Sequence, residues 1–345
     1  MRHIAAGLLI IALSFGLIQA ATPAAAQDEY LIGLVTDIGP VDDRSFNQSA
    51  WEGAKAAAEM FNGVADFIET TDTADYANNI LIFAEQEYDI IITVGFALGD
   101  ATLDAAEKFP KTHFIGVDID AKSLMEQKKV NLPNFTGLVF REDKMGFLAG
   151  VLAARMTKSN VIAAVLPADL PPVVRFKDGF EAGAKYVNAE IRLLSTFYPG
   201  TIVTAFDDPA WGAATASQAI DQGADVIFSG GGKTGNGGLQ EVAKRTTVDK
   251  PLYCIGVDTD QWFTVPEAQP CLIVSATKSI AEGVMEIITQ VREGKITEGG
   301  NFEGKVALSD FHDFEDIVPQ AVKDELKQLE IELNEGKLNP DGTRP

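Results

Sequence analysis

Carboxylates follow two similar apolar segments of the chain. The segment IGVDID at 115–120 is matched by IGVDTD at 255–260. Ligands of parallel α/β sheets bind beyond the carboxyl ends of the strands. If both segments are strands in lobes that face each other, we expect their carboxylates to converge on a cleft. Buried carboxylates accept strong hydrogen bonds from hydroxyl groups, so the repeat indicates a binding cleft.

The segment DIGPVDDRSFNQ at 37–48 is a second candidate for ligand contact. It leaves an apolar run, turns at a Gly-Pro pair and meets two aspartates, which are natural helix N-caps. This pattern places the ring of Phe46 and the amide of Asn47 in the first helical turn, beside the carboxyl edge of the sheet. Ligands bind at such helix starts, and core packing is the alternative role for Phe46.

A glycine-rich segment, GGGKTGNGG at 230–238, contains the Gly-Lys-Thr of a phosphate-binding loop. That loop also requires a glycine five residues before the second one, and this position holds Ile227. The segment therefore argues against nucleotide hydrolysis. Because glycines let the backbone approach a ligand closely, we expect a flexible turn that lines the ligand.

Hydrolytic and metal chemistry find little support in the sequence. No Gly-x-Ser-x-Gly motif is present, and His113 and His312 have no histidine or cysteine at metal-ligand spacing. The two cysteines, Cys254 and Cys271, fall in segments that resemble strands. Export would permit a disulfide between them, and two buried thiols are the alternative. We expect a binding protein without cofactor or metal, rather than an enzyme.

Short apolar runs alternate with helical patterns, which favours open parallel α/β sheets. Runs of β-branched residues suit parallel strands buried on both faces. GADVIF at 223–228 precedes the second IGVD segment as EYDIII at 87–92 precedes the first, so we expect two similar units in tandem. Strands are expected at 30–35, 90–94, 113–117, 161–166, 225–229, 253–257 and 272–276, and helices at 45–61, 100–108, 145–156, 178–187, 280–292 and 322–335.

The overall charge excludes one class of partner. The chain has 28 Lys and Arg against 50 Asp and Glu, a formal net charge of -22. That field repels phosphate groups, and no basic run with interleaved aromatic residues is present. We therefore expect no nucleic-acid partner.

Residues 1–26 have the order of a secretory signal. A short basic start is followed by an apolar stretch from Ile4 to Ile18 and by small residues up to Ala26. The apolar stretch is shorter than the roughly 20 residues that span a bilayer. We expect cleavage after Ala26, and no cysteine near that site can take a lipid anchor. The mature chain would then be periplasmic or otherwise extracytoplasmic.

Together these motifs resemble the basic membrane protein family of substrate-binding proteins, whose best-described members are purine nucleoside receptors of ABC importers. The matching segments are DRSFNQ at 43–48, both IGVDxD segments, GADVIF at 223–228 and GGKTGNG at 231–237. The resemblance covers about residues 30 to 320. It implies the type I periplasmic-binding-protein fold, in which two Rossmann-like lobes with parallel sheets are joined by a hinge.

This fold implies that the chain crosses between the lobes. We expect the first lobe to hold residues 28–146 and about 258–285. The second lobe would hold residues 147–257 and about 286–335. Residues 336–345 form a polar tail that we expect to fray.

The resemblance also implies roles for residues of the first lobe. Asp37 and Asn47 would hydrogen-bond the solute, and Phe46 would stack on a heterocyclic base. Asp120 would accept hydrogen bonds from the edge of that base.

In the second lobe, Phe206 or Trp211 would complete the stack from the other side of the base. Asp258 would accept hydrogen bonds from ribose hydroxyls. Lys278, paired with Asp258, would donate to the same hydroxyls, and Gly231 would line the sugar.

The resemblance therefore implies a monomer that captures a nucleoside, in particular a purine nucleoside, for an ABC permease and its ATPase. Riboflavin or a sugar is the alternative ligand, because Trp211 departs from the usual family pattern. An exported nucleoside hydrolase and a ligand-sensing partner of a membrane receptor are alternatives from other classes. The acidity of the chain and the missing lipid-anchor cysteine are further departures from the family.

Overall fold

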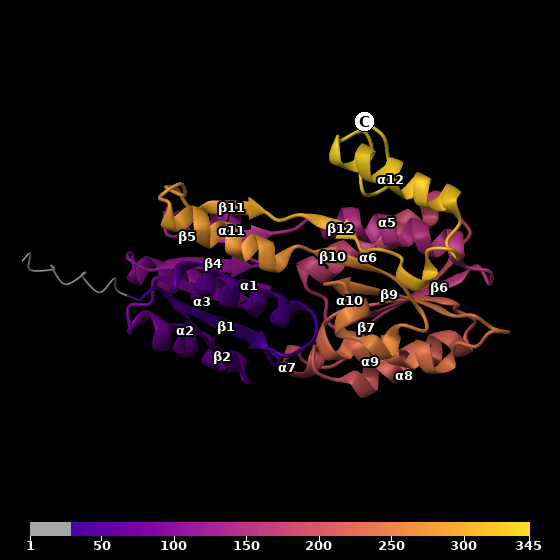
Figure 1. Ribbon diagram of the computed structural model, residues 1–345, viewed down its shortest axis with the longest axis horizontal. Coiled ribbons are helices and arrows are strands. Elements are labelled where there is room, and N and C mark those ends of the chain that lie inside the picture. The colour runs from indigo at the N-terminus through magenta and orange to yellow at the C-terminus, as the bar shows by residue number, and fades with distance from the viewer. Residues whose placement is uncertain (1–28) are drawn as a thin grey trace, which may run out of the picture.

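Two α/β lobes lie end to end along the long axis of the molecule, each around a six-stranded sheet (Figure 1). The computed structural model describes residues 29–345, so the predicted signal segment, residues 1–26, lies outside the described residues. Among the helices of residues 29–345, none is both long and apolar enough to cross a membrane. The predicted fold class, two lobes of mostly parallel α/β sheet, is confirmed.

The first lobe has helices on both faces of a wholly parallel sheet. Its strands are β1 (Leu31–Ile38), β2 (Val64–Thr70), β3 (Ile90–Val94), β4 (His113–Val117), β5 (Phe135–Val139) and β11 (Gly300–Glu303), and its helices are α1 (Phe46–Phe61), α2 (Tyr76–Ala84), α3 (Gly99–Lys108), α4 (Ala121–Lys128) and α11 (Ile280–Arg292). The strand order is β11-β5-β4-β3-β1-β2. Helices α1 and α11 cover one face, and α2 and α3 cover the other, because the strands are apolar on both faces.

The second lobe repeats this arrangement with one antiparallel strand. Its strands are β6 (Val161–Leu166), β7 (Arg192–Phe197), β8 (Val226–Ser229), β9 (Tyr253–Asp258), β10 (Leu272–Lys278) and β12 (Val306–Leu308), and its helices are α5 (Glu142–Met156), α6 (Pro171–Val187), α7 (Ile202–Ala205), α8 (Pro209–Asp221), α9 (Gly232–Arg245), α10 (Gln261–Thr264) and α12 (Gln320–Asn334). The strand order is β12-β10-β9-β8-β6-β7, and β12 runs antiparallel to β10. Helices α5, α6 and α12 share one core with the sheet, while α8 and α9 cover its other face.

The chain crosses between the lobes three times, before α5, before α11 and before β12. This corrects the predicted boundaries. Residues 258–278 do not return to the first lobe, because β10 pairs with β9 in the second sheet. Residues 280–303 do return, since α11 packs on α1 and β11 pairs with β5. The third crossing was expected near residue 286 and lies instead between β11 and β12, two strands of only 4 and 3 residues.

The glycine-rich segment is the start of helix α9 and not a flexible turn. A Cβ on Gly212 of α8 would lie 1.9 Å from the carbonyl oxygen of Thr234, and one on Gly237 would lie 2.1 Å from that of Pro209. The glycines therefore let the backbones of α8 and α9 touch. Only the first glycines of the segment remain at the edge of the sheet, where Gly231 has a φ of 95°.

A disulfide joins Cys254 to Cys271, with their Cα atoms 5.1 Å apart. Cys254 lies in β9 and Cys271 directly precedes β10, and these strands are parallel neighbours. Both cysteines are buried beneath α9, where Cys271 contacts the carbonyl oxygen of Leu239.

The tail packs against the second lobe, so the expectation that residues 336–345 fray is wrong. Leu338 is 1% exposed, and Arg344 forms an ion pair with Glu332 of α12 at 2.6 Å. These two contacts hold the tail, and a polar composition alone does not reveal them.

Candidate ligand-binding site

A cavity lies between the lobes, at the carboxyl ends of both sheets. Each lobe supplies one wall. From the first lobe come Asp37, Ile38, Gly39, Pro40, Asp43, Phe46, Asn47, Gly95, Phe96 and Asp118, and from the second lobe come Leu166, Pro167, Leu170, Pro172, Val173, Phe176, Phe206, Phe228, Gly230, Gly231, Gly232, Val257, Asp258 and Lys278. The carboxylates lie mostly on the first wall, and the aliphatic side chains mostly on the second.

Asp37 reaches the cavity from the carboxyl end of strand β1. Its carboxylate has no hydrogen-bond partner among residues 29–345, although the residue is only 9% exposed. Burial raises its pKa well above the usual value, and the nearby carboxyls of Asp43 and Asp118 add to the rise. A Cβ on Gly95 would lie 2.1 Å from Asp37 Oδ2, so a glycine there is what makes room for this carboxylate.

The start of α1 is fixed by the side chain of Asp43. Its carboxylate accepts hydrogen bonds from the backbone N–H groups of Ser45, Asn47 and Gln48 at 2.9, 3.0 and 3.1 Å. Burial raises the pKa of Asp43 to about 7, although these three bonds lower it. The capped turn then presents Phe46 and Asn47 to the cavity.

The amide of Asn47 is half satisfied. Its Nδ2 donates to the carbonyl oxygen of Pro40 at 3.3 Å. Its Oδ1 is buried and has no partner among the described residues. An unpaired buried acceptor is costly, so this oxygen is suited to accept a hydrogen bond from a ligand.

The repeated motif places its first aspartate at the cavity in both lobes. Asp118 follows β4 and Asp258 ends β9, and both have left-handed backbones with φ values of 58° and 67°. Asp258 Oδ2 accepts a hydrogen bond from Ser45 Oγ at 2.7 Å, while Asp118 Oδ1 is buried without a partner in residues 29–345. The shared backbone geometry brings one carboxylate to each wall of the cavity.

Asp120 does not line the cavity. Its carboxylate caps α4, accepting from the Ser123 backbone N–H at 2.9 Å, and also accepts from Asn301 Nδ2 at 2.7 Å. These bonds lower its pKa against the effect of burial. The structure therefore brings Asp118 to the cavity in place of Asp120, and the sequence contained the signal, because Asp118 aligns with Asp258 in the internal repeat.

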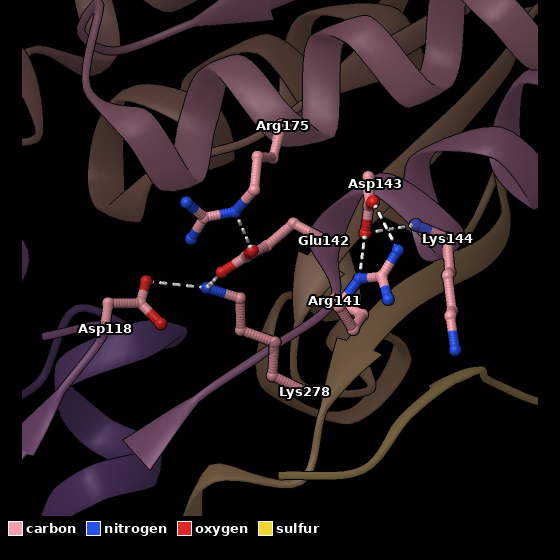
Figure 2. Close-up of polar contacts among 7 residues, drawn as sticks. All are labelled: Asp118, Arg141, Glu142, Asp143, Lys144, Arg175 and Lys278. Carbon is pink, nitrogen blue, oxygen red and sulfur yellow. Dashed lines mark hydrogen bonds and ion pairs between the residues drawn. The ribbon is translucent and has the colours of Figure 1, made fainter. Parts of the chain in front are cut away.

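Lys278, the last residue of β10, carries a buried ammonium group between two carboxylates (Figure 2). Its Nζ lies 2.7 Å from Asp118 Oδ2 and 2.9 Å from Glu142 Oε1. Glu142 in turn accepts from Arg175 Nε at 2.7 Å. Lys278 thus pairs with Asp118 and Glu142, and the expected pair with Asp258 is not formed.

The same ammonium group lies among aromatic rings. The centroids of Phe46, Phe140 and Phe176 are 5.3, 5.2 and 5.5 Å from Lys278 Nζ. Burial alone would lower the pKa of Lys278, but the surrounding carboxylates more than offset this and raise it. The group therefore remains a cation within the cavity wall.

Of the two aromatic side chains considered for the second lobe, Phe206 lines the cavity and Trp211 does not. Trp211 lies on α8, where its ring packs edge-on against Tyr198 with the centroids 5.0 Å apart. Phe176 and Phe228 also line the cavity from helix α6 and strand β8. Phe176 lies in no motif, and Phe228 ends the GADVIF segment, which marked a strand and not a ligand contact.

Comparison with known proteins gives one family. The family model described as "ABC transporter substrate-binding protein PnrA-like" matches residues 31–327. The nucleoside-binding protein BmpA of Lactococcus lactis is 30% identical over 319 residues, 88% of this chain and 87% of that protein. Basic membrane protein A1 of Borrelia garinii is 27% identical and covers 88% of this chain and 85% of its own length.

Solved structures give the same fold. A solute-binding protein of an ABC transporter system from Aeropyrum pernix superposes with a TM-score of 0.78 at 22% identity, covering 90% of this chain and 92% of that one. A solute-binding protein from Conexibacter woesei has a TM-score of 0.68 at 21% identity, covering 91% of this chain and 99% of that one.

Proposed function

Because the chain belongs to the family of PnrA-like ABC transporter substrate-binding proteins, we propose that it captures a nucleoside, in particular a purine nucleoside, and delivers it to a permease and its ATPase. One observation carries the choice of ligand. The cavity combines aromatic rings from both lobes with carboxylates from both lobes. A nucleoside offers two π faces and several hydrogen-bond donors, and so matches both features.

The base would bind between Phe46 of the first lobe and Phe206 of the second. Stacking of a base on an aromatic ring is worth about 1–3 kcal/mol. Asp37, Asn47 Oδ1 and Asp118 Oδ1 are acceptors without a protein partner in the described chain. They would accept from N–H groups on the edge of the base. Asp120 and Trp211 have no part in this arrangement, since neither lines the cavity.

The sugar would bind beside the second motif. Asp258 is buried and would accept from ribose hydroxyls, while Lys278 would donate the proton that its two carboxylate partners leave free. Gly231 and Gly232 bring backbone to the same wall without side chains. The nucleoside-binding relative from Lactococcus lactis supports a ligand of this class.

The charge of the cavity would exclude phosphorylated ligands. Four carboxyl groups, those of Asp37, Asp43, Asp118 and Asp258, line it together with one ammonium group, that of Lys278. Phosphate would bring further negative charge into a buried acidic site, which is strongly unfavourable. A nucleoside would therefore bind, and the corresponding nucleotide would not.

We also propose that the protein works outside the cytoplasm as a monomer that closes by hinge motion on its ligand. The signal-like order of residues 1–26 supports export. The disulfide between Cys254 and Cys271 fits an oxidising compartment.

The test is calorimetric titration of the mature protein, unfolded and refolded with its disulfide intact to remove any ligand that copurifies. The panel is inosine, guanosine, adenosine, cytidine, ribose, riboflavin and inosine monophosphate. Micromolar or tighter binding of a purine nucleoside, no binding of its monophosphate and no new product on chromatography support the proposal. Binding of ribose or riboflavin alone refutes the ligand. Release of free base makes the protein a hydrolase and refutes the transport role.

A further inference from the structure

Residues Asp42–Ser45 join β1 to α1 in the first lobe, and the second lobe contacts each of them. We call this four-residue stretch the closure segment. The contacts join Lys233 to Asp42 at 3.8 Å, Asn236 to the carbonyl of Asp43 at 2.9 Å, Thr264 and Glu267 to Arg44, and Asp258 to Ser45 at 2.7 Å. All of them must break when the lobes separate.

Arg44 is held through both its main chain and its side chain. Its carbonyl oxygen accepts from Thr264 Oγ1 at 2.9 Å, and its Nε donates to the carbonyl oxygen of Thr264. Its guanidinium pairs with Glu267 at 2.6 Å. Arg44 also has a φ of 63°, a left-handed backbone that costs about 1–2 kcal/mol for a residue with a Cβ. The contacts from the second lobe offset this cost only while the cleft is closed.

Asn236 of helix α9 contacts the closure segment from the second lobe. Its Nδ2 donates to the carbonyl oxygen of Asp43, and its Oδ1 accepts from Gln261 Nε2 at 2.8 Å. Gln261 is itself fixed, because its Oε1 accepts from the backbone N–H of Val257 at 2.9 Å. Asn236 is 5% exposed and does not line the cavity. Its amide is thus oriented toward the first lobe before the lobes meet.

The closure segment leads directly into the cavity. Phe46 and Asn47 follow it without an intervening residue, and Asp43 caps the helix that carries both. Ser45 bonds to Asp258, which lines the opposite wall. A change in the conformation of the segment must therefore move the start of α1.

We propose that the closure segment acts as a latch between the lobes. The second lobe binds the segment through Asn236, Thr264 and Glu267. Closure of the cleft therefore also sets the positions of Phe46 and Asn47. Arg44 and Asn236 are positioning residues in this scheme, since they act through the segment and touch no ligand. The proposal rests on the two-lobed capture described above but not on the identity of the ligand. The latch stabilises the closed protein even when it is empty.

The experiment compares Arg44→Gln and Thr264→Val with wild-type protein. Neither residue lines the cavity, and Thr264→Val keeps the shape of the side chain while removing its hydroxyl donor. Small-angle scattering without ligand measures the mean separation of the lobes, and stopped-flow measurements with inosine as the probe give its association and dissociation rates. We expect both variants to have a larger radius of gyration than the wild type. We also expect dissociation about 3 to 10 times faster, association within twofold, and an unchanged preference between inosine and guanosine.

Arg155→Gln is the matched control. Arg155 forms a two-pronged ion pair with Glu325 at 2.7 and 2.8 Å, but both residues belong to the second lobe. This variant should behave like the wild type in both measurements. If Arg44→Gln and Thr264→Val also match the wild type in ligand-free scattering, the latch is refuted. If inosine fails to bind the wild type, the proposed ligand is wrong, and scattering alone still decides the latch.

Discussion

Lys278 Nζ lies 2.7 Å from Asp118 Oδ2, so the end of β10 in the second lobe bonds directly to the end of β4 in the first. Both side chains are buried, and Glu142 Oε1 lies 2.9 Å from the same nitrogen. The cation that lines the ligand cavity is therefore also a link between the lobes. Changes at this pair should affect stability and binding together.

Lys278→Met should reduce the free energy of unfolding by about 3–5 kcal/mol, because it leaves the carboxylate of Asp118 buried without its cation and removes one of the two cations that Glu142 contacts. Urea unfolding at neutral pH measures the change. The control is Lys128→Met, which removes an exposed pair with Asp100 and should cost less than about 1 kcal/mol. Equal losses in the two variants would contradict the buried pair.

Phe46→Leu and Phe206→Leu should each weaken nucleoside binding by about 5- to 150-fold, the equivalent of 1–3 kcal/mol of stacking. Titration calorimetry with inosine measures the loss. Trp211→Leu should change the affinity by less than about twofold, because this ring packs on Tyr198 outside the cavity. A larger effect for Trp211 than for Phe206 would reverse the assignment.

Asp37→Asn should weaken binding and yet stabilise the empty protein. The carboxylate is buried, has no hydrogen-bond partner in residues 29–345, and has a pKa raised by burial and by Asp43 and Asp118. Losing an acceptor for a ligand donor should cost about tenfold or more in affinity. Removing this unpaired, buried carboxyl group should raise the melting temperature at neutral pH. Asp120→Asn, outside the cavity, should leave the affinity unchanged. Equal losses of affinity in the two variants would contradict the assignment of Asp37, and not Asp120, to the ligand site.

The pH dependence of stability should contain a contribution from Asp43. Its pKa is raised to about 7 in the folded protein, whereas an unfolded aspartate titrates at about 3.9. Between these values the folded chain retains a proton that the unfolded chain has lost. The free energy of unfolding should therefore fall as pH rises from about 4 to 7, by at most about 1.4 kcal/mol per pH unit from this group.

Asp43→Asn tests that contribution, since the amide cannot titrate. Denaturant unfolding of both proteins from pH 4 to 8 should show the wild type losing stability relative to the variant as pH rises. Two parallel curves would show that Asp43 titrates at an ordinary value.

Replacing both Cys254 and Cys271 by alanine should lower stability by about 3 kcal/mol, because the disulfide closes a loop with a sequence separation of 17. Thermal unfolding measures the change. Inosine affinity should be unchanged, since neither cysteine lines the cavity. A loss of affinity without a loss of stability would contradict a purely structural role.

The sequence predicted the central strands well and the edge strands poorly. The runs at 90–94, 113–117 and 161–166 are strands with those bounds, because central parallel strands are apolar on both faces. Strand β2 was missed because it is an edge strand, mostly exposed and without an apolar run. Strand β7 was missed for the same reason, since no residue in it is fully buried.

The site was predicted in outline for a similar reason. Phe46, Asn47 and Asp258 lie beside strand ends, where short motifs mark the position. Asp118 was missed although the sequence marks it, because Asp118 and not Asp120 aligns with Asp258 in the internal repeat. The neighbours of Lys278 depend on chain crossings that no local pattern reveals.

The three chain crossings affect how reproducibly the contacts between the lobes re-form. A single connection would let the lobes twist and slide as well as open. Three connections, before α5, before α11 and before β12, restrict the lobes to a narrow range of relative motion. Each time the protein empties and reloads, Arg44 should return to Glu267 and Ser45 to Asp258 without a search among other pairings. The accuracy of the closed site is then a property of the chain path, retained each time the lobes close.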